Sequence, residues 1–176
     1  QRLCARELAL TKQMDLYSAT PPLVATRLLM SRCASWRQGR TARQLMALDV
    51  KRAFLNAPCK RAIFVKPPRE DEEATRKGLL WRLLKAMYGT RDAPVLWQGE
   101  VRRVMKEMGF TISRACPCIF FLKRMDLAII THVDDFLCDG PRSHVQWIRE
   151  EIGSKYEVKG KLVSSLPEDY KETSYL

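Results

Sequence analysis

Apolar residues recur along the chain with two different spacings. Short apolar stretches predict strands at residues 43–49, 62–66, 79–84, 118–123, 127–133 and 136–138. Apolar side chains at helical spacing predict helices over residues 23–36, 93–108 and 143–153. Between them, the charged stretch 70–77 predicts a solvated surface loop. Strands and helices mixed in this way predict an α+β fold.

The first two predicted helices carry recognisable end signals. Thr20 is a candidate cap for the helix at 23–36, and Gly39 lies beyond its end. Its expected core face holds Val24, Leu28, Cys33 and Trp36. The helix at 93–108 has Asp92 as a candidate cap, Pro94 in its first turn and Gly109 after its end. Its expected core face holds Trp97, Val101, Val104, Met105 and Met108.

Composition narrows the range of partners. The chain has 31 Lys and Arg against 20 Asp and Glu, a net charge of +11, which favours a polyanionic partner. With 46% hydrophobic residues, 176 residues suffice for one core or two subdomains. No apolar run approaches the roughly 20 residues of a membrane helix, so we expect no membrane partner. The six cysteines lack zinc-binding spacing; we expect reduced thiols, with Cys118 a small core residue.

The most informative chemistry is the acidic pair Asp134-Asp135, which lies on a bend between two apolar strands. Neighbouring carboxylates repel each other unless a cation sits between them. A third carboxylate, Asp49, ends the apolar stretch 43–49. Three carboxylates at strand ends match a two-metal phosphoryl-transfer site, because Mg²⁺ prefers oxygen ligands. The alternative is an ordinary solvated turn, since Asp is common in turns.

Three segments carry a resemblance to a known family. Residues 48–56, LDVKRAFLN, resemble the first palm motif of copia-type retrotransposon reverse transcriptases, L-D-V-K-x-A-F-L. Residues 84–97, LKAMYGTRDAPVLW, are similar to that family's L-x-x-x-Y-G-L-K-Q-A-P-R-x-W, and residues 132–135 stand where the family has Y-V-D-D. The three motifs occur in the family's order, which makes the match specific. Residues 2–6 resemble the fingers segment, and residues 156–159 the strand after the catalytic hairpin.

The resemblance implies a right-hand polymerase architecture. It comprises a palm, which is a ferredoxin-like antiparallel sheet with packed helices, and partial fingers. Fingers would occupy mostly residues 1–44 and 57–92, palm mostly 45–56 and 93–165, and 166–176 would begin a downstream region. We therefore expect a polyprotein fragment without its thumb and ribonuclease H regions. Its oligomeric state is not predicted.

The resemblance also implies a set of site residues. The implied catalytic residues are Asp49, Asp134 and Asp135. With Val50 they would hold two Mg²⁺ ions, or Mn²⁺ in their place. The implied nucleotide-binding residues are Val50, Lys51, Arg52, Ala53, Phe54, Gly89, Arg91, Arg2 and Arg6. The implied primer and template contacts are His132, Tyr88 and Pro94. Phe54 would exclude a ribose 2′-hydroxyl; the alternative is an ordinary core phenylalanine.

Four positions depart from the family pattern. His132 replaces a tyrosine, Asp92 a glutamine and Val95 an arginine, while Cys116 stands where aspartate is frequent. None of these changes removes a metal-binding carboxylate. The loss of the tyrosine and the added charge of Asp92 are expected to lower activity.

The leading hypothesis is an RNA-directed DNA polymerase domain of a retrotransposon polyprotein. It would transfer deoxynucleotides from dNTP to a DNA primer end on an RNA template. The family implies an intracellular location, in a cytoplasmic particle or the nucleus. One alternative is a catalytically inactive remnant of a decayed retroelement that still binds nucleic acid. Another is a structural protein whose Asp-Asp turn is accidental.

Overall fold

The computed structural model describes residues 4–7, 16, 18–35, 42–164 and 167–173. The chain forms two compact units. Unit 1 comprises Gln1–Ser18 and Ala53–Glu100, and unit 2 comprises Ala19–Arg52 and Val101–Leu176. Each is considered by itself.

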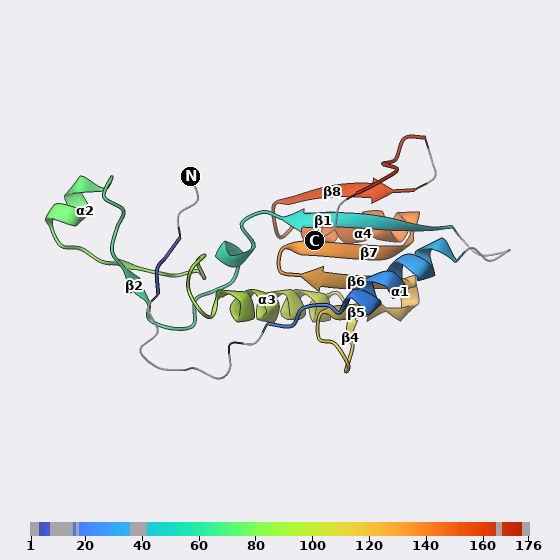
Figure 1. Ribbon diagram of the computed structural model, residues 1–176, viewed down its shortest axis with the longest axis horizontal. Helices are drawn as coiled ribbons and strands as arrows, with labels where there is room; N and C mark the ends of the chain where they lie inside the picture. The colour runs from blue at the N-terminus through green and yellow to red at the C-terminus, as the bar shows by residue number, and fades with distance from the viewer. Residues whose placement is uncertain (1–3, 8–15, 17, 36–41, 165–166, 174–176) are drawn as a thin grey trace. The chain divides into compact units, whose positions relative to one another are not determined.

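Unit 2 is built on an antiparallel sheet (Figure 1). In the described residues its strands are β1 (Arg43–Val50), β4 (Thr111–Ile112), β5 (Ile119–Leu122), β6 (Leu127–His132), β7 (Asp135–Pro141) and β8 (Val158–Val163). They lie in the order β4-β5-β6-β7-β1-β8, and each neighbouring pair is antiparallel. The predicted antiparallel α+β fold is confirmed.

The chain order explains this sheet. Strand β1 is followed by helix α3 (Ala93–Glu107), the hairpin β6–β7, helix α4 (Arg142–Gly153) and strand β8. Strand β7 lies between β1 and β6, and β1 lies between β7 and β8, which is a pair of split β-α-β units. Two short 3₁₀ helices, η1 (Ala53–Asn56) and η2 (Lys123–Met125), follow β1 and β5. Helices α3 and α4 fall where the sequence predicts them.

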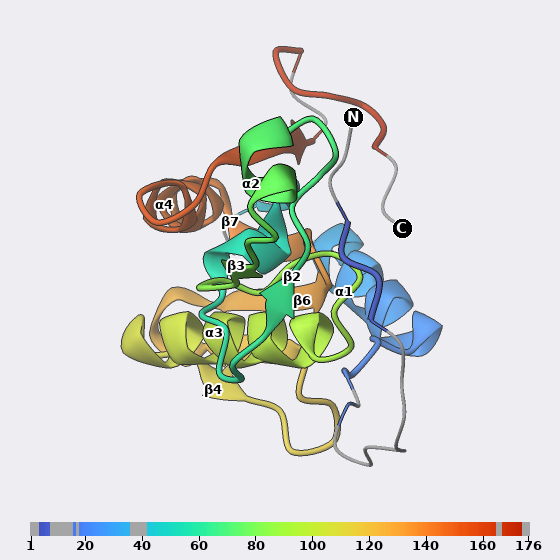
Figure 2. The same ribbon diagram turned by 90° about the vertical axis from the view of Figure 1, so that its left-hand side faces the viewer.

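The two faces of the sheet are covered by different helices (Figure 2). Burial alternates along β1, so successive side chains point to opposite faces. On one face, Leu45 and Ala47 pack near Leu29 of helix α1 (Leu23–Ala34). On the other, a Cβ atom added to Gly160 would lie 2.5 Å from Leu48 Cδ2 and 3.6 Å from the Nε atom of Arg149 on α4. Side chains of α4 that are buried there are Val145, Ile148 and Ile152, as predicted.

The predicted core face of α1 is wrong. Val24 and Leu28 are 73% and 68% exposed, whereas Thr26 and Leu29 are buried. Cap and length differ too, because Pro22 is the N-cap residue and the helix ends at Ala34. Apolar spacing suits either face of this helix, and contacts with the sheet select the face with Leu29. Trp36 and Gly39 lie outside the described residues.

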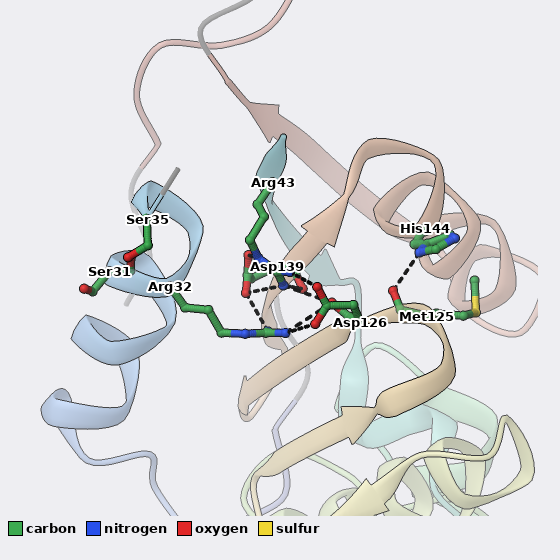
Figure 3. A network of polar contacts seen from close by, with 8 residues as sticks. All are labelled: Ser31, Arg32, Ser35, Arg43, Met125, Asp126, Asp139 and His144. Carbon is green, nitrogen blue, oxygen red and sulfur yellow. Dashed lines mark hydrogen bonds and ion pairs between the residues drawn. The ribbon is translucent and has the colours of Figure 1, made fainter. Parts of the chain in front are cut away.

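Helix α1 is fixed to the sheet by ionic contacts (Figure 3). Asp139 on β7 is fully buried and accepts from Arg32 Nη1 at 2.7 Å and Arg43 Nε at 2.9 Å. Both arginines also pair with Asp126, which lies between β5 and β6. The network therefore joins α1, β1 and β7 through charges that sequence spacing does not reveal.

Unit 1 contains a small sheet of β2 (Phe64–Val65) and β3 (Trp81–Arg82), both shorter than the predicted strands. The predicted loop over 70–77 is wrong, because α2 (Glu72–Arg76) forms there. Asp71 caps this helix by accepting from the backbone N–H of Ala74 at 3.0 Å. The charged segment thus has a local reason to be helical.

Helix α3 confirms its prediction closely. It buries Trp97, Val101, Val104 and Met105, and Gly109 beyond its end has a φ of +88°. Met108, also predicted for the core face, follows the end of the helix at Glu107 and is half-buried. Cys118 is fully buried beside Ala19, as expected for a small core residue. None of the helices in the described part of the chain has the length and apolar character needed to cross a membrane.

Candidate active site

The acidic pair and Asp49 meet at one end of the sheet of unit 2. Asp49 on β1 is directly opposite Asp135 on β7, and Asp135 is directly opposite His132 on β6. On its other side Asp49 is opposite Lys159 on β8. Residues directly opposite in an antiparallel sheet project from the same face, so these four side chains form one row across the sheet. The sheet therefore places two of the predicted catalytic carboxylates side by side.

Asp134 belongs to the turn that joins β6 to β7. Only Val133 and Asp134 separate the two strands, and Val133 has a φ of +52°. That conformation is costly for a β-branched residue. The backbone N–H of Val50 donates to the carbonyl of Asp134 at 2.9 Å, which ties the turn to the end of β1. Asp134 and Asp135 therefore differ in setting, because Asp134 lies in the turn and Asp135 begins strand β7.

The charges of Asp134 and Asp49 act electrostatically on Asp135. Burial raises the pKa of Asp135, and the negative charges of Asp134 and Asp49 raise it further. His132 acts in the opposite direction on the pKa of Asp135. A carboxylate destabilised by neighbouring carboxylates is a group whose ionised form a cation would stabilise.

The donor atoms fit a hard divalent cation, because they are carboxylate oxygens on neighbouring strand ends. Within the described ranges, however, no three His, Cys, Asp or Glu side chains are gathered as a ready metal-binding cluster. The chemistry of the residues therefore fits magnesium, and their side chains would have to converge around it.

Two basic residues follow Asp49 and contact the same acidic partner. Lys51 and Arg52 both pair with Glu157, which precedes β8, and the Arg52 Nη2 to Glu157 Oε2 distance is 2.7 Å. The backbone N–H of Lys51 donates to the carbonyl of Glu157 at 2.9 Å. These contacts fix the chain just beyond Asp49. Hydrogen bonds from Lys51 and Arg52 lower the pKa of the exposed Glu157.

Residues of the second motif lie in unit 1. The rings of Phe54 and Tyr88 are 4.7 Å apart between centroids, at an angle of 50°, and Phe54 is half-buried there. Gly89 has a φ of +91°, and a Cβ atom there would lie 1.7 Å from the carbonyl oxygen of Ala5. The close approach that requires glycine is therefore made by the protein's own backbone.

The remaining predicted residues are placed as follows. Val50 and Ala53 are buried, Pro94 is half-buried in the first turn of α3, and Arg6 is exposed. Arg2 lies outside the described residues. Since the nucleotide-binding and primer-contacting sets each draw on both units, a shared pocket stays a prediction.

Sequence reasoning missed Glu7 and Arg61. Arg61 pairs with both Glu7 and Asp92, and the backbone N–H of Arg91 donates to Glu7 at 2.8 Å. No spacing rule links residues 7, 61 and 92. The departure from the family pattern at Asp92 is the single signal that could have prompted a search for a basic partner.

Carboxylates brought together at neighbouring strand ends suit a metal-dependent phosphoryl-transfer domain, because metal ions held there would stabilise the attacking and leaving oxygens. Comparison with known protein families identifies the family to which the chain belongs. Residues 9–165 match the family described as Reverse transcriptase (RNA-dependent DNA polymerase). The chain therefore belongs to the reverse transcriptase family.

Curated relatives agree with this assignment. The chain is 29% identical over 115 residues to a transposon Ty5-1 protein of Saccharomyces cerevisiae, covering 64% of the chain and 37% of that protein. It is 24% identical over 149 residues to the retrovirus-related Pol polyprotein from transposon TNT 1-94 of Nicotiana tabacum, covering 82% and 11%. For the corresponding polyprotein from transposon RE2 of Arabidopsis thaliana, the identity is 32% over 95 residues, covering 53% and 6%. The chain thus spans a minor part of each relative, and the predicted copia-type resemblance is confirmed.

Proposed function

We propose that the chain is the RNA-directed DNA polymerase domain of a retrotransposon polyprotein. Unit 2 would be most of the palm, and unit 1 would hold much of the fingers. The observation that carries the proposal is the position of Asp49, Asp134 and Asp135 together at one end of the sheet.

Within this proposal, Asp49 and Asp134 would hold two Mg²⁺ ions, or Mn²⁺ in their place, with the backbone of Val50 nearby. When bound, such ions activate the primer 3′-hydroxyl and neutralise the triphosphate. Asp135 would support them from the neighbouring strand position. Its pKa is raised first by burial and then by the negative charges of Asp134 and Asp49, and the cations would offset those charges. The pairing of Asp49 with Asp135 keeps the carboxylates in fixed register.

The nucleotide would be held by the turn after β1 and by the second motif. Backbone N–H groups of residues 52–54 would face the triphosphate, since turns that begin a helix commonly bind phosphate, whereas the backbone N–H of Lys51 already donates to Glu157. Phe54, supported by Tyr88, would lie under the sugar and exclude a 2′-hydroxyl. Gly89 would act through its contact with Ala5 rather than with nucleotide.

The partners are an RNA template, a DNA primer and dNTP. The net charge of +11 supports binding of the polyanionic strands. His132 would face the primer end, since it lies in the same row as the carboxylates. Tyr88 and Pro94 would contribute to the template side. Thumb and ribonuclease H functions would come from other parts of the polyprotein, inside a cytoplasmic particle or the nucleus.

The test is single-nucleotide primer extension on an RNA template with magnesium, using the full-length protein and its Asp134→Asn form. We expect incorporation to fall by at least about a thousandfold, since electrostatic stabilisation is commonly the largest catalytic contribution. Glu107→Gln, on the exposed end of α3, is the matched control and should keep full activity. Unchanged extension by Asp134→Asn would refute the metal assignment. Tight template–primer binding without extension by the unmutated protein would instead indicate the inactive remnant.

A further inference from the structure

Three separate segments of unit 1 meet at the guanidinium group of Arg61. Asp92 accepts from Arg61 Nε at 2.7 Å and from Nη2 at 3.0 Å. Glu7 accepts from Arg61 Nη1 at 3.1 Å and from Nη2 at 3.2 Å. The single guanidinium therefore makes a two-point contact with each of two carboxylates. Arginine is suited to this role, because its planar group presents donors along two edges, which lysine does not.

The network is partly shielded from water. Side-chain exposure is 11% for Asp92, 21% for Glu7 and 36% for Arg61. Hydrogen bonds from Arg61 lower the pKa of Asp92 and of Glu7, while the two carboxylates raise the pKa of Arg61. Both carboxylates are thus charged at neutral pH, and Arg61 offsets the repulsion between them.

The network holds residues 4–7 against residues 88–92. Glu7 also accepts from the backbone N–H of Arg91 at 2.8 Å. The backbone N–H of Ala5 donates to the carbonyl of Tyr88 at 2.7 Å, beside the close approach of Ala5 to Gly89. Arg6 lies between these two anchors. Arg6 and Arg91 are the two described arginines expected to bind triphosphate, and contacts of Ala5 and Glu7 therefore hold the backbone around both of them.

We propose that Arg61 is a positioning residue, and that with Glu7 and Asp92 it fixes Arg6 and Arg91 for the dNTP triphosphate. This inference rests on the proposed polymerase function. It changes the interpretation of Asp92, which the sequence comparison marks as a departure expected to lower activity. In this chain the charge of Asp92 is neutralised by Arg61, so the two residues form a compensated pair.

The test is steady-state primer extension by the full-length protein with dNTP varied, using Arg61→Gln, Asp92→Asn and the double variant. We expect Arg61→Gln to raise the KM for dNTP roughly tenfold and to change kcat less than about twofold, because positioning of the triphosphate is lost. Arg61→Lys should give an intermediate KM, because it keeps the charge and loses the two-sided contact. The double variant should be no worse than Arg61→Gln, since coupled residues are not additive. The control is Lys77→Gln, which breaks the exposed Glu73–Lys77 pair on α2.

The outcomes separate this inference from the function on which it rests. If the unmutated protein extends primers and Asp92→Asn and Arg61→Gln keep its KM for dNTP, the positioning role is refuted and the polymerase function stands. If Arg61→Gln and Asp92→Asn lower kcat equally and leave the KM for dNTP unchanged, the network has a merely structural role, and the positioning role is also refuted. If the unmutated protein extends no primer, the proposed function fails and this inference fails with it.

Discussion

Val133 and Asp135 show that the carboxylate end of the sheet is built against the preferences of its residues. Val133 has a φ of +52°, in a region that β-branched side chains rarely occupy. Asp135 has a raised pKa because it is partly buried and close to Asp134 and Asp49. Unfavourable backbone and charge at one place commonly mark a functional site.

Replacing Val133 by asparagine should stabilise the protein by about 1 kcal/mol, because asparagine tolerates a left-handed backbone better than valine does. The measurement is the free energy of unfolding in urea. Val24→Asn is the matched control, since Val24 is exposed on a regular helix. If Val133→Asn changes the free energy of unfolding no more favourably than Val24→Asn does, the assignment of strain to Val133 is contradicted.

Asp135→Asn should raise the free energy of unfolding at pH 7 by about 1 kcal/mol, as when a functional residue is replaced at a cost to activity. A raised pKa in the folded state means that ionised Asp135 destabilises the fold above that pKa. Well below the ordinary value of 3.8 the carboxyl is neutral in both states, so the benefit should vanish as the pH falls through that region. Unfolding curves across pH 3 to 7 measure this. A variant less stable than the unmutated protein at pH 7 would be the contrary result.

Among the elements, α1 depends on one buried carboxylate. Asp139 is fully buried and receives both Arg32 and Arg43, so that α1, β1 and β7 share one ionic centre (Figure 3). Burial of an unpaired charge is costly, and therefore these contacts matter more when one partner is removed than as a net source of stability.

Asp139→Ala should lower the free energy of unfolding by about 3 kcal/mol, since the largely buried Arg43 would lose its buried partner. Hydrogen exchange should accelerate first in α1. The exposed pair Arg103–Glu107 provides the control, because Glu107→Gln should change stability by less than about 0.5 kcal/mol. Equal effects of the two substitutions would show that Asp139 is not an anchor.

Elements with strong local signals could be predicted from the sequence. Helix α3 has its apolar spacing, an early proline and a glycine after its end, and the structure agrees. The face of α1 could not be predicted, because exposed Val24 and Leu28 are as apolar as buried Leu29. Helix α2 was not predicted, because the cap residue Asp71 stands in a run of charged residues that resembles a solvated loop.

The candidate site was predictable to a different degree. The order of the motifs indicates Asp49, Asp134 and Asp135 as candidate catalytic residues. The register between β1 and β7 brings Asp49 and Asp135 together. By contrast, the pairing of Arg61 with Glu7 and Asp92 joins positions far apart in sequence, and no periodicity encodes it. Long-range charge pairs depend on how the chain folds back, so only the structure reveals them.

At the scale of the whole molecule, charge should dominate nucleic-acid binding. With a net charge of +11, binding of a template–primer should release counterions from several phosphates. Contact with about four phosphates would give a slope of roughly −3 to −4 in a plot of log affinity against log salt concentration. Fluorescence anisotropy of a labelled RNA–DNA hybrid from 50 to 300 mM salt measures it. A slope near zero would contradict a nucleic-acid-binding function.

The most direct test of the central claim is primer extension on an RNA template with magnesium, comparing the full-length protein with its Asp49→Asn form. Asp49 lies directly opposite Asp135, and its replacement removes one carboxylate while preserving the shape of the side chain. The account predicts that template–primer affinity is unchanged within about twofold and that incorporation is lost. Undiminished incorporation by Asp49→Asn would contradict it.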